Sequence, residues 1–280
     1  MLTSPLSRKR NINPTFYKSL LLIFVESMDM KTALITGATS GIGLATARLL
    51  SQNNFALVLC GRNTEKLAEL KQELSEVVPV ETLDFDVRDQ DLVKQKIGSL
   101  KEAPFHEIDV LINNAGNAHG LDPIDKGSVE DWDAMMDINV KGLLYVSHAI
   151  IPQMRERKSG HVINIGSTAG KEVYPNGNVY CGSKHAVDAI TTGMRLDLNP
   201  YGIRVGAVNP GLVETSFSEV RFKGDTQRAE KVYQGYKALQ PQDVADVILF
   251  AVTRPPHVNI ADLTVMCTAQ ASSVVLNKKA

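Results

Sequence analysis

A tyrosine and a lysine stand four residues apart in the second half of this 280-residue chain, at Tyr180 and Lys184. On a helix, residues at this spacing share a face, so the phenol and the ammonium point into the same space. A free phenol titrates at about 10, but a fixed positive charge nearby favours the phenolate. Ser167, thirteen residues upstream, would add a hydrogen bond to a substrate oxygen, and Asn139 lies further back. The set predicts proton transfer through Tyr180, although chance also places a tyrosine and a lysine one turn apart.

A glycine-rich turn lies between a short apolar run, Lys31–Thr36, and a helical stretch, Leu44–Gln52. Glycines let the backbone approach a pyrophosphate, and the helix N-terminus offers free N–H groups. The spacing is Gly-x-x-x-Gly-x-Gly instead of the common Gly-x-Gly-x-x-Gly. We therefore predict a phosphate-binding turn made of Gly37, Ala38, Thr39, Ser40, Gly41, Ile42 and Gly43.

The second apolar run ends at Gly61 and is followed by Arg62 and Asn63. In dinucleotide-binding folds the residue at this place reads the adenosine ribose: an acid binds the 2′-hydroxyl, and an arginine pairs with a 2′-phosphate. A guanidinium matches phosphate geometry, so Arg62 favours a phosphorylated cofactor. The alternative is a solvated arginine at the end of a strand.

Short apolar runs alternate with amphipathic stretches through the chain. The runs predict strands at Ala33–Thr36, Ala56–Cys60, Val80–Phe85, Val110–Asn113, His161–Ser167, Arg204–Asn209 and Leu263–Met266. The stretches predict further helices at Thr64–Val77, Gln90–Leu100, Val129–Met154, Val179–Asn199 and Gln242–Val252. Strands alternating with helices form parallel βαβ units. We therefore predict one α/β domain over residues 30–280, with a doubly wound parallel seven-stranded sheet of the Rossmann type.

The composition argues against several classes of partner. The formal net charge is -1, so no bulk field attracts nucleic acid or an anionic membrane. The three cysteines are widely spaced and include no Cys-x-x-Cys pair, which indicates neither a disulfide framework nor a metal site. A reducing cytoplasm is the predicted location.

The N-terminal residues 1–29 differ from the rest of the sequence. Arg8-Lys9-Arg10 precedes an apolar run, Leu20–Val25, in the manner of a signal peptide. The run is too short to span a membrane, and no small-residue cleavage site follows it. We interpret these residues as a disordered tail or a mis-assigned start, with a targeting role as the alternative.

Six motifs together resemble the short-chain dehydrogenase/reductase family, in their order and at their intervals. They are Thr36-Gly37-x-x-x-Gly41-Ile42-Gly43, Asn113-Asn114-Ala115-Gly116, Asn139, Ser167, Tyr180-x-x-x-Lys184 and Asn209-Pro210-Gly211. Each motif alone is weak, whereas the ordered set is specific. Later segments, including Val220–Asp225 and His257–Ile260, resemble the NADP-dependent 3-hydroxy acid dehydrogenases within this family.

The resemblance implies NADP as cofactor, small 3-hydroxy acids as substrates and a homotetramer as the assembly. The substrates implied are serine, L-allo-threonine and the 3-hydroxypropionate/malonic semialdehyde pair. Tyr180 would take the hydroxyl proton, Lys184 would lower its pKa and hold the ribose, and Ser167 would hold the substrate oxygen. Further cofactor contacts are implied for Asn63, Asp86, Val87, Asn113, Asn114, Ala115, Gly116, Tyr180, Lys184, Pro210, Gly211, Val213 and Thr215.

The resemblance also gives Asn139 a role, as the residue that kinks its helix and holds a water that relays protons from Lys184. The alternative is a buried asparagine satisfied by backbone groups. A buried substrate carboxylate needs a cationic partner, and Lys184 is already committed. The segment after Pro210-Gly211 holds Arg221 and Lys223. The planar fork of Arg221 suits a carboxylate, so we predict that it binds the acid end, with a solvated lid charge as the alternative.

Two other functions stay open at this level. A non-catalytic NADP-binding scaffold has no need of the intact set Asn139, Ser167, Tyr180 and Lys184. A 3-oxoacyl-thioester reductase shares all four residues, and only the segment Phe217–Tyr236 separates it from a 3-hydroxy acid dehydrogenase.

Overall fold

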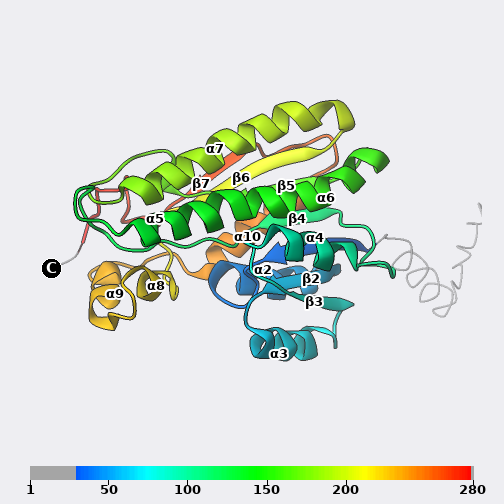
Figure 1. Cartoon of the computed structure of the whole chain (residues 1–280), viewed down its shortest axis with the longest axis horizontal. Helices are drawn as coiled ribbons and strands as arrows, with labels where there is room; N and C mark the ends of the chain where they lie inside the picture. Colours follow the sequence, from blue (N-terminus) through cyan, green and yellow to red (C-terminus); the bar gives the residue numbers. More distant parts are fainter. Residues whose placement is uncertain (1–29, 279–280) are drawn as a thin grey trace, which may run out of the picture. The chain divides into compact units, whose positions relative to one another are not determined.

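The computed structural model describes residues 30–278 and contains one parallel sheet of seven strands in the order β3-β2-β1-β4-β5-β6-β7 (Figure 1). The strands are β1 Lys31–Thr36, β2 Phe55–Gly61, β3 Val80–Asp84, β4 Val110–Asn113, β5 His161–Ile165, β6 Arg204–Pro210 and β7 Asp262–Val265. The central strands are buried along nearly their whole length because helices cover both faces of the sheet.

Helices alternate with the strands along the chain. They are α2 Gly41–Ser51, α3 Thr64–Leu74, α4 Gln90–Gly98, α5 Val129–Met136, the π-helix η1 Asp137–Gly142, α6 Leu143–Arg157, the 3-10 turn η2 Thr168–Gly170, α7 Asn178–Leu198, the 3-10 turn η3 Asn199–Tyr201, α8 Phe217–Arg221, α9 Thr226–Tyr233 and α10 Pro241–Val252. One apolar core joins the sheet to α2, α3 and α10, and a second joins its other face to α4, α6 and the end of α7. The predicted α/β class and doubly wound parallel sheet are confirmed.

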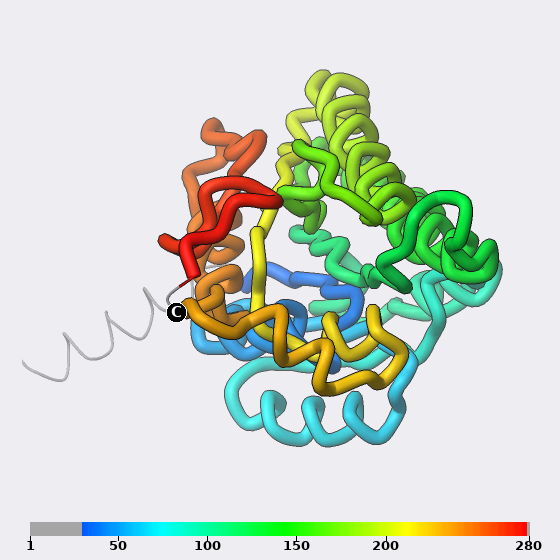
Figure 2. The backbone as a smooth tube through the Cα atoms, turned by 90° about the vertical axis from the view of Figure 1, so that its left-hand side faces the viewer, coloured from blue at the N-terminus to red at the C-terminus, as the bar shows by residue number. Residues whose placement is uncertain are grey.

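The order in which strands are added to the sheet changes side at β1: β2 and β3 lie on one side of it, and β4 to β7 lie on the other. This strand pairs with β2 on one side and with β4 on the other, so Ile35 stands opposite both Leu59 and Ile112. In open parallel sheets such a switch point leaves a crevice at the carboxyl ends of the strands. Figure 2 looks onto this end, where α8 and α9 (gold) and the C-terminal segment (red) lie around the turn that follows β1 (blue).

The predicted strands agree with the structure to within two residues at each end, and the predicted helix Val129–Met154 is helical throughout but contains a π-helical segment at Asn139, where the resemblance implied a kink. The stretch Val129–Met154 is divided into α5, η1 and α6. Asn139 lies inside the π-helical segment and its side chain bonds to the backbone of Asn117, a contact between distant parts of the chain. Short π segments of this kind occur often at functional sites.

The segment between β6 and α10 holds two helices that periodicity did not predict, α8 and α9. Each is shorter than three turns, so too few apolar residues repeat to give a recognisable pattern. The predicted N-terminal extension, residues 1–29, lies outside the described residues. Within the described part of the chain, no helix is both long enough and apolar enough to cross a membrane.

Candidate active site

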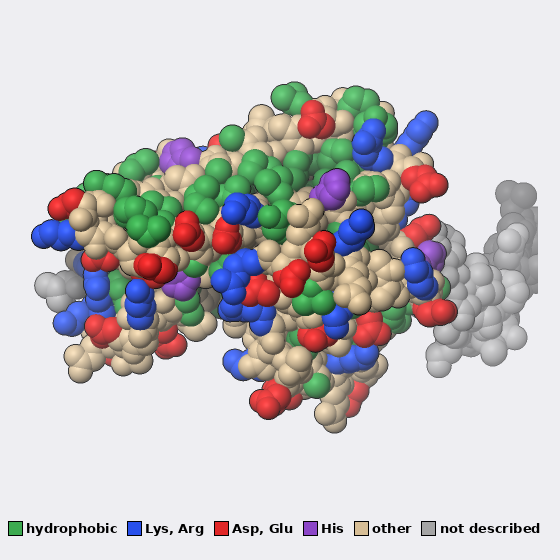
Figure 3. Space-filling model, in the orientation of Figure 1, with side chains coloured by type: hydrophobic (Ala, Val, Ile, Leu, Met, Phe, Trp, Pro, Cys, Tyr) green, Lys and Arg blue, Asp and Glu red, His purple; other side chains and the backbone are tan. Residues whose placement is uncertain are grey.

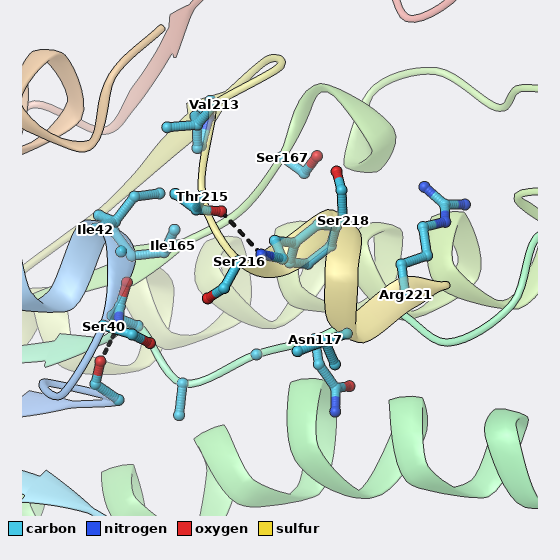
Figure 4. A pocket seen from close by; sticks show the side chains of 18 of the residues that line it. Ser40, Ile42, Asn117, Ile165, Ser167, Val213, Thr215, Ser216, Ser218 and Arg221 are labelled. Atoms are coloured by element: carbon cyan, nitrogen blue, oxygen red, sulfur yellow. Dashed lines mark hydrogen bonds between the residues drawn. The ribbon is translucent and has the colours of Figure 1, made fainter. Parts of the chain in front are cut away.

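A cavity of about 490 Å³ lies at the carboxyl ends of the strands and gathers most of the predicted residues. The predicted residues that line it are Gly37, Thr39, Ser40, Gly41, Ile42, Arg62, Asp86, Val87, Asn114, Ala115, Gly116, Ser167, Tyr180, Lys184, Pro210, Gly211, Val213, Thr215 and Arg221. Figure 4 shows Ser40 and Ile42 on one side of this cavity and Ser167, Ser218 and Arg221 on the other. Strand ends that are far apart in sequence therefore form one site.

The glycine turn provides a close-fitting cradle for a phosphate group. Gly37 and Gly41 have positive φ angles of 65° and 51°, which an L side chain rarely adopts. A Cβ atom on Gly43 would lie 2.2 Å from the carbonyl oxygen of Gly37, so only glycine fits there. Within residues 30–278, the Ser40 side chain makes no cap hydrogen bond to α2. The first N–H groups of α2 are thus available to an anion, and the turn fits the pyrophosphate of a dinucleotide.

Charged side chains gather at the end of β2, where a 2′-phosphate would lie. Arg62 is largely exposed and its Nη1 lies 3.6 Å from Oδ2 of Asp86. Arg88, which the sequence reasoning missed, donates to the same carboxylate at 2.8 Å. Burial alone would raise the pKa of Asp86, but the bonds from Arg88 and the charge of Arg62 hold it below its usual range. Because the Arg62 side chain is largely exposed, its guanidinium is accessible to a phosphate in spite of the long ion pair with Asp86.

Tyr180, Lys184 and Ser167 meet on the far wall of the cavity. The Lys184 ammonium is buried and donates to the carbonyl oxygen of Ile165 at 2.9 Å, and burial lowers the pKa of Lys184 to about 8. Burial raises the pKa of Tyr180, whereas a hydrogen bond with Ser167 and the charge of Arg221 act to lower it. Burial dominates, and Lys184 is not among the groups that lower the pKa of Tyr180, so the expected lowering by Lys184 is not found.

Asn139 lies behind the cavity wall. Its Oδ1 accepts from the N–H of Asn117 at 2.8 Å, and its Nδ2 donates to the Asn117 carbonyl at 2.8 Å and to Ser183 Oγ at 3.0 Å. The side chain is thus bonded chiefly to backbone groups. A Cβ atom on Gly116 would lie 3.1 Å from Asn139 Oδ1 and 3.5 Å from Lys184 Nζ, so both groups border one small space. The predicted water relay between them stays a prediction.

Other predicted cofactor residues are also absent from the cavity wall within the described chain. Ala38 is fully buried, and Gly43 packs against the backbone of Gly37. Asn63 caps α3 by accepting from the N–H of Lys66. Asn113 is buried, and its Nδ2 donates to Ser147 and Asn164 at 2.9 Å each. These residues do not line the cavity, but their packing and hydrogen bonds hold the strand ends and the glycine turn in place.

The sequence reasoning missed several residues on the substrate side of the cavity. The ring of Phe217 lies edge-on to Tyr180, with the two centres 5.7 Å apart. Ser218 Oγ lies 2.7 Å from the hydroxyl of Tyr233, and Tyr174 lines the same wall. Phe217, Ser218 and Tyr233 belong to the helices α8 and α9 that periodicity did not reveal. Among residues 30–278, no group of three or more His, Cys, Asp or Glu side chains is placed to hold a metal ion.

Two known enzymes are similar to this chain in sequence over most of their length. The chain is 45% identical over 238 residues to NADP-dependent 3-hydroxy acid dehydrogenase YdfG of Escherichia coli (strain K12), covering 85% of this chain and 95% of that protein. It is 44% identical over 241 residues to sulfoacetaldehyde reductase 2 of Chromohalobacter salexigens, covering 86% and 95%.

A solved structure gives a similar result. The closed form of serine dehydrogenase complexed with NADP+ superposes with a TM-score of 0.83 at 42% identity, covering 89% of this chain and 100% of that one. The sequence model described as short chain dehydrogenase matches residues 31–226, which include the glycine turn, Ser167, Tyr180 and Lys184. The chain therefore belongs to the short-chain dehydrogenase family.

Proposed function

We propose that this protein interconverts small 3-hydroxy acids and their 3-oxo forms with NADP as the hydride carrier. The chain is an NADP-dependent oxidoreductase that acts on CH–OH groups. The substrates proposed are serine, L-allo-threonine and 3-hydroxypropionate, with malonic semialdehyde as the product of the last. The observation that carries this choice is the position of Arg221 beside Tyr180.

Arg221 presents a cationic group to the cavity. Its Cζ lies 5.5 Å from the centre of the Tyr180 ring. Its Nη2 is buried and has no hydrogen-bond partner in the described chain. A buried donor on a charged group costs free energy until an acceptor reaches it. A carboxylate supplies that acceptor and also compensates the charge, so the acid end of the substrate fits at Arg221.

The proton chemistry follows from the residues around Tyr180. The Tyr180 oxygen accepts the proton of the substrate hydroxyl while Ser167 holds the substrate oxygen. Lys184, buried beside them, is the group proposed to favour the phenolate when it carries its proton, and to bind the ribose hydroxyls. Bound NADP supplies the hydride-accepting nicotinamide. Asn139 positions the loop of Asn117 behind these groups.

The relatives support a second candidate substrate with the same layout. Sulfoacetaldehyde and malonic semialdehyde both carry an aldehyde, one methylene group and an anionic group. The relative named sulfoacetaldehyde reductase 2 takes its name from the first of these compounds. A guanidinium binds either anion, so both compounds meet the requirement set by Arg221. The other alternative is a 3-oxoacyl-thioester reductase. Its substrate carries a neutral thioester where the acids carry a carboxylate, so the charge of Arg221 would have no anionic partner.

We also propose a homotetramer in the cytoplasm. Apolar side chains gather on one face over α5, α6 and α7 (Figure 3), and they include the exposed Val129, Met136, Leu144 and Leu196. Such a patch is typical of a protein interface. The three cysteines are free and buried, as is usual for a protein of a reducing compartment.

A substrate panel with two matched variants tests the proposed function. Oxidation of 3-hydroxy acids, isethionate, neutral alcohols and a 3-hydroxyacyl thioester is followed with NADP and NAD. In Arg221→Met, KM for the acids should rise at least about tenfold, since a hydrogen bond to a charged group contributes roughly 1.5–3 kcal/mol. KM for neutral alcohols should stay unchanged.

Arg228→Met serves as the control. Arg228 belongs to the same segment between β6 and α10, here called the lid (residues 211–240), where it stacks on Phe222 at 4.3 Å, and it does not line the cavity. Equal losses on acids and alcohols in Arg221→Met would indicate a misfolded lid. A thioester oxidised in preference to every acid would replace the proposed function by the thioester alternative.

A further inference from the structure

The three nitrogen atoms of Arg221 have three different surroundings. Nε donates to the carbonyl oxygen of Gly120 at 3.1 Å, and Nη1 donates to the hydroxyl of Tyr174 at 3.0 Å. Nη2 is buried without a partner among residues 30–278. The guanidinium Cζ is 5.5 Å from the centres of both the Tyr174 and the Tyr180 rings. The fork is thus held at two corners, and its third corner has no hydrogen-bond partner in the described chain.

A second connection ties Arg221 to the loop beneath it, because the N–H of Gly120 donates to the Arg221 carbonyl at 2.9 Å. Gly120 therefore bonds both the backbone and the side chain of Arg221. These two bonds to Gly120 fix the position of the Arg221 backbone and the position of its Nε atom. The rotation of the guanidinium plane about that point depends on the bond from Nη1 to Tyr174.

Tyr174 is itself held firmly in place. A Cβ atom on Gly177 would lie 2.1 Å from the Tyr174 ring, so the ring packs directly on the backbone at this glycine. The N–H of Gly177 donates to the Tyr174 carbonyl at 3.1 Å, and the ring packs against the small core that contains Tyr180 and Cys181. An aromatic ring on a glycine backbone has little freedom to move, and its hydroxyl is a fixed point.

We propose that Tyr174 is a positioning residue that sets the specificity of the enzyme for acidic substrates, by holding one amino group of Arg221 so that the other faces the cavity. This inference rests on the proposed function, because it assigns the acid end of the substrate to Arg221. Tyr174 need not touch the substrate, and no step of proton transfer passes through it. Its role is to reduce the orientational freedom that the guanidinium would otherwise lose on binding.

The same geometry affects Tyr180. Arg221 is one of the groups that counteract the raised pKa of Tyr180. The Tyr174 hydroxyl itself acts in the opposite direction, because its charge raises the pKa of Tyr180 and ranks above the lowering by Arg221. The readout for Tyr174 is therefore the KM for acids against neutral alcohols, and not the pH profile.

Tyr174→Phe tests the proposal because it keeps the ring and its packing and removes only the hydroxyl. KM for 3-hydroxy acids should rise about tenfold, the effect of one hydrogen bond to a charged group. KM for neutral alcohols and the Kd for NADP should stay within twofold, a margin of about 0.4 kcal/mol.

A matched control exists at Tyr201. Its hydroxyl accepts from Arg155 Nη2 at 2.6 Å and its ring lies 4.3 Å from Arg155 Cζ, the same pair of contacts at a site outside the cavity. Tyr201→Phe should leave both substrate classes unaffected. In an Arg221→Met background, Tyr174→Phe should add no further loss, because the two residues act as one unit.

The remaining outcomes separate this inference from the proposed function. If Arg221→Met raises KM for acids and Tyr174→Phe does not, the positioning role is wrong and the proposed function stands. If neither variant distinguishes acids from neutral alcohols, both fail. Equal losses on both substrate classes in Tyr174→Phe would mean that the hydroxyl only supports lid packing, which also overturns the positioning role.

Discussion

The guanidinium carbon of Arg221 lies 5.5 Å from the centre of the Tyr180 ring, although the two residues belong to different helices, α8 and α7. This contact joins the group that we assign to the acid end of the substrate with the group that carries the proton. It also places a permanent positive charge where burial raises the pKa of the phenol. Substrate recognition and acid–base chemistry thus share one contact.

Replacement of Tyr180 by phenylalanine should abolish turnover and spare cofactor binding. The ring and its edge-on contact with Phe217 remain, and the proton carrier is lost. We expect kcat to fall by at least about 100-fold, the lower range for general acid–base catalysis. NADP titration monitored by fluorescence or calorimetry should give an unchanged Kd. Substantial residual turnover in the purified variant would remove Tyr180 from the assigned role.

Arg62→Asp should shift cofactor preference from NADP toward NAD. The change removes the phosphate partner and adds a carboxylate suited to the ribose 2′-hydroxyl. The measurement is the ratio of kcat/KM for the two cofactors. Arg48→Asp is the control, since Arg48 is an exposed arginine paired with Glu73 and does not line the cavity. An unchanged ratio in Arg62→Asp would make Arg62 a surface arginine only.

Gly43→Ala and Gly193→Ala should have opposite effects on stability. The Cβ atom at position 43 would lie 2.2 Å from the Gly37 carbonyl oxygen and 2.5 Å from Asn114 Nδ2. Relief of that overlap should cost roughly 1–3 kcal/mol and weaken NADP binding. Gly193 lies inside α7, where a Cβ atom would meet nothing within 4 Å among the described residues, and alanine there should add about 0.5–1 kcal/mol. Urea unfolding measures both, and effects of the same sign would contradict the prediction.

His161 should make the protein less stable in acid. It lies at the start of β5 between Val110 and Arg204, and neither ring nitrogen has a hydrogen-bond partner within residues 30–278. Burial, with Arg204 and Lys31 nearby, lowers its pKa to about 3 from an ordinary 6.5. Between these two pKa values, His161 binds a proton in the unfolded chain but not in the folded chain. The free energy of unfolding therefore falls as the pH decreases from 6.5 toward 3.

The replacement His161→Leu should remove this part of the pH dependence. Unfolding free energies measured across that range should differ in slope from the parent protein by up to about 1.4 kcal/mol per pH unit. The exposed His257, changed to leucine, is the control and should leave the slope as it is. Parallel curves for the parent protein and His161→Leu would show that His161 binds a proton in the folded state.

The assembly can be measured directly by light scattering. We expect a tetramer at micromolar concentration, through the apolar face of α5, α6 and α7 that includes Leu144 and Leu196. Leu144→Glu should shift the population to smaller species, because a charge would then enter the interface. A monomer mass for the parent protein would contradict the proposed tetramer.

Local sequence patterns were enough to predict the fold class and the positions of several residues of the candidate site. Tyr180 and Lys184 share a helix face because of their spacing, and the turn from Gly37 to Gly43 follows a strand and opens a helix by its own chemistry. Alternation of apolar runs with amphipathic stretches was sufficient for the parallel sheet. These features depend on residues close together in the chain, which is why a sequence reveals them.

Contacts between distant segments decided the rest. Asn139 lies in a π-helical segment that periodicity alone does not predict, and its side chain bonds to the backbone of Asn117, which is 22 residues away in the chain. The Tyr180 pKa depends on burial and on the approach of Arg221, neither of which is a property of spacing. Tyr174 lies in the loop before α7, and Arg221 reaches its hydroxyl from α8. These hydrogen bonds and pKa shifts arise only when the fold brings distant groups together, so the tertiary structure alone decides them.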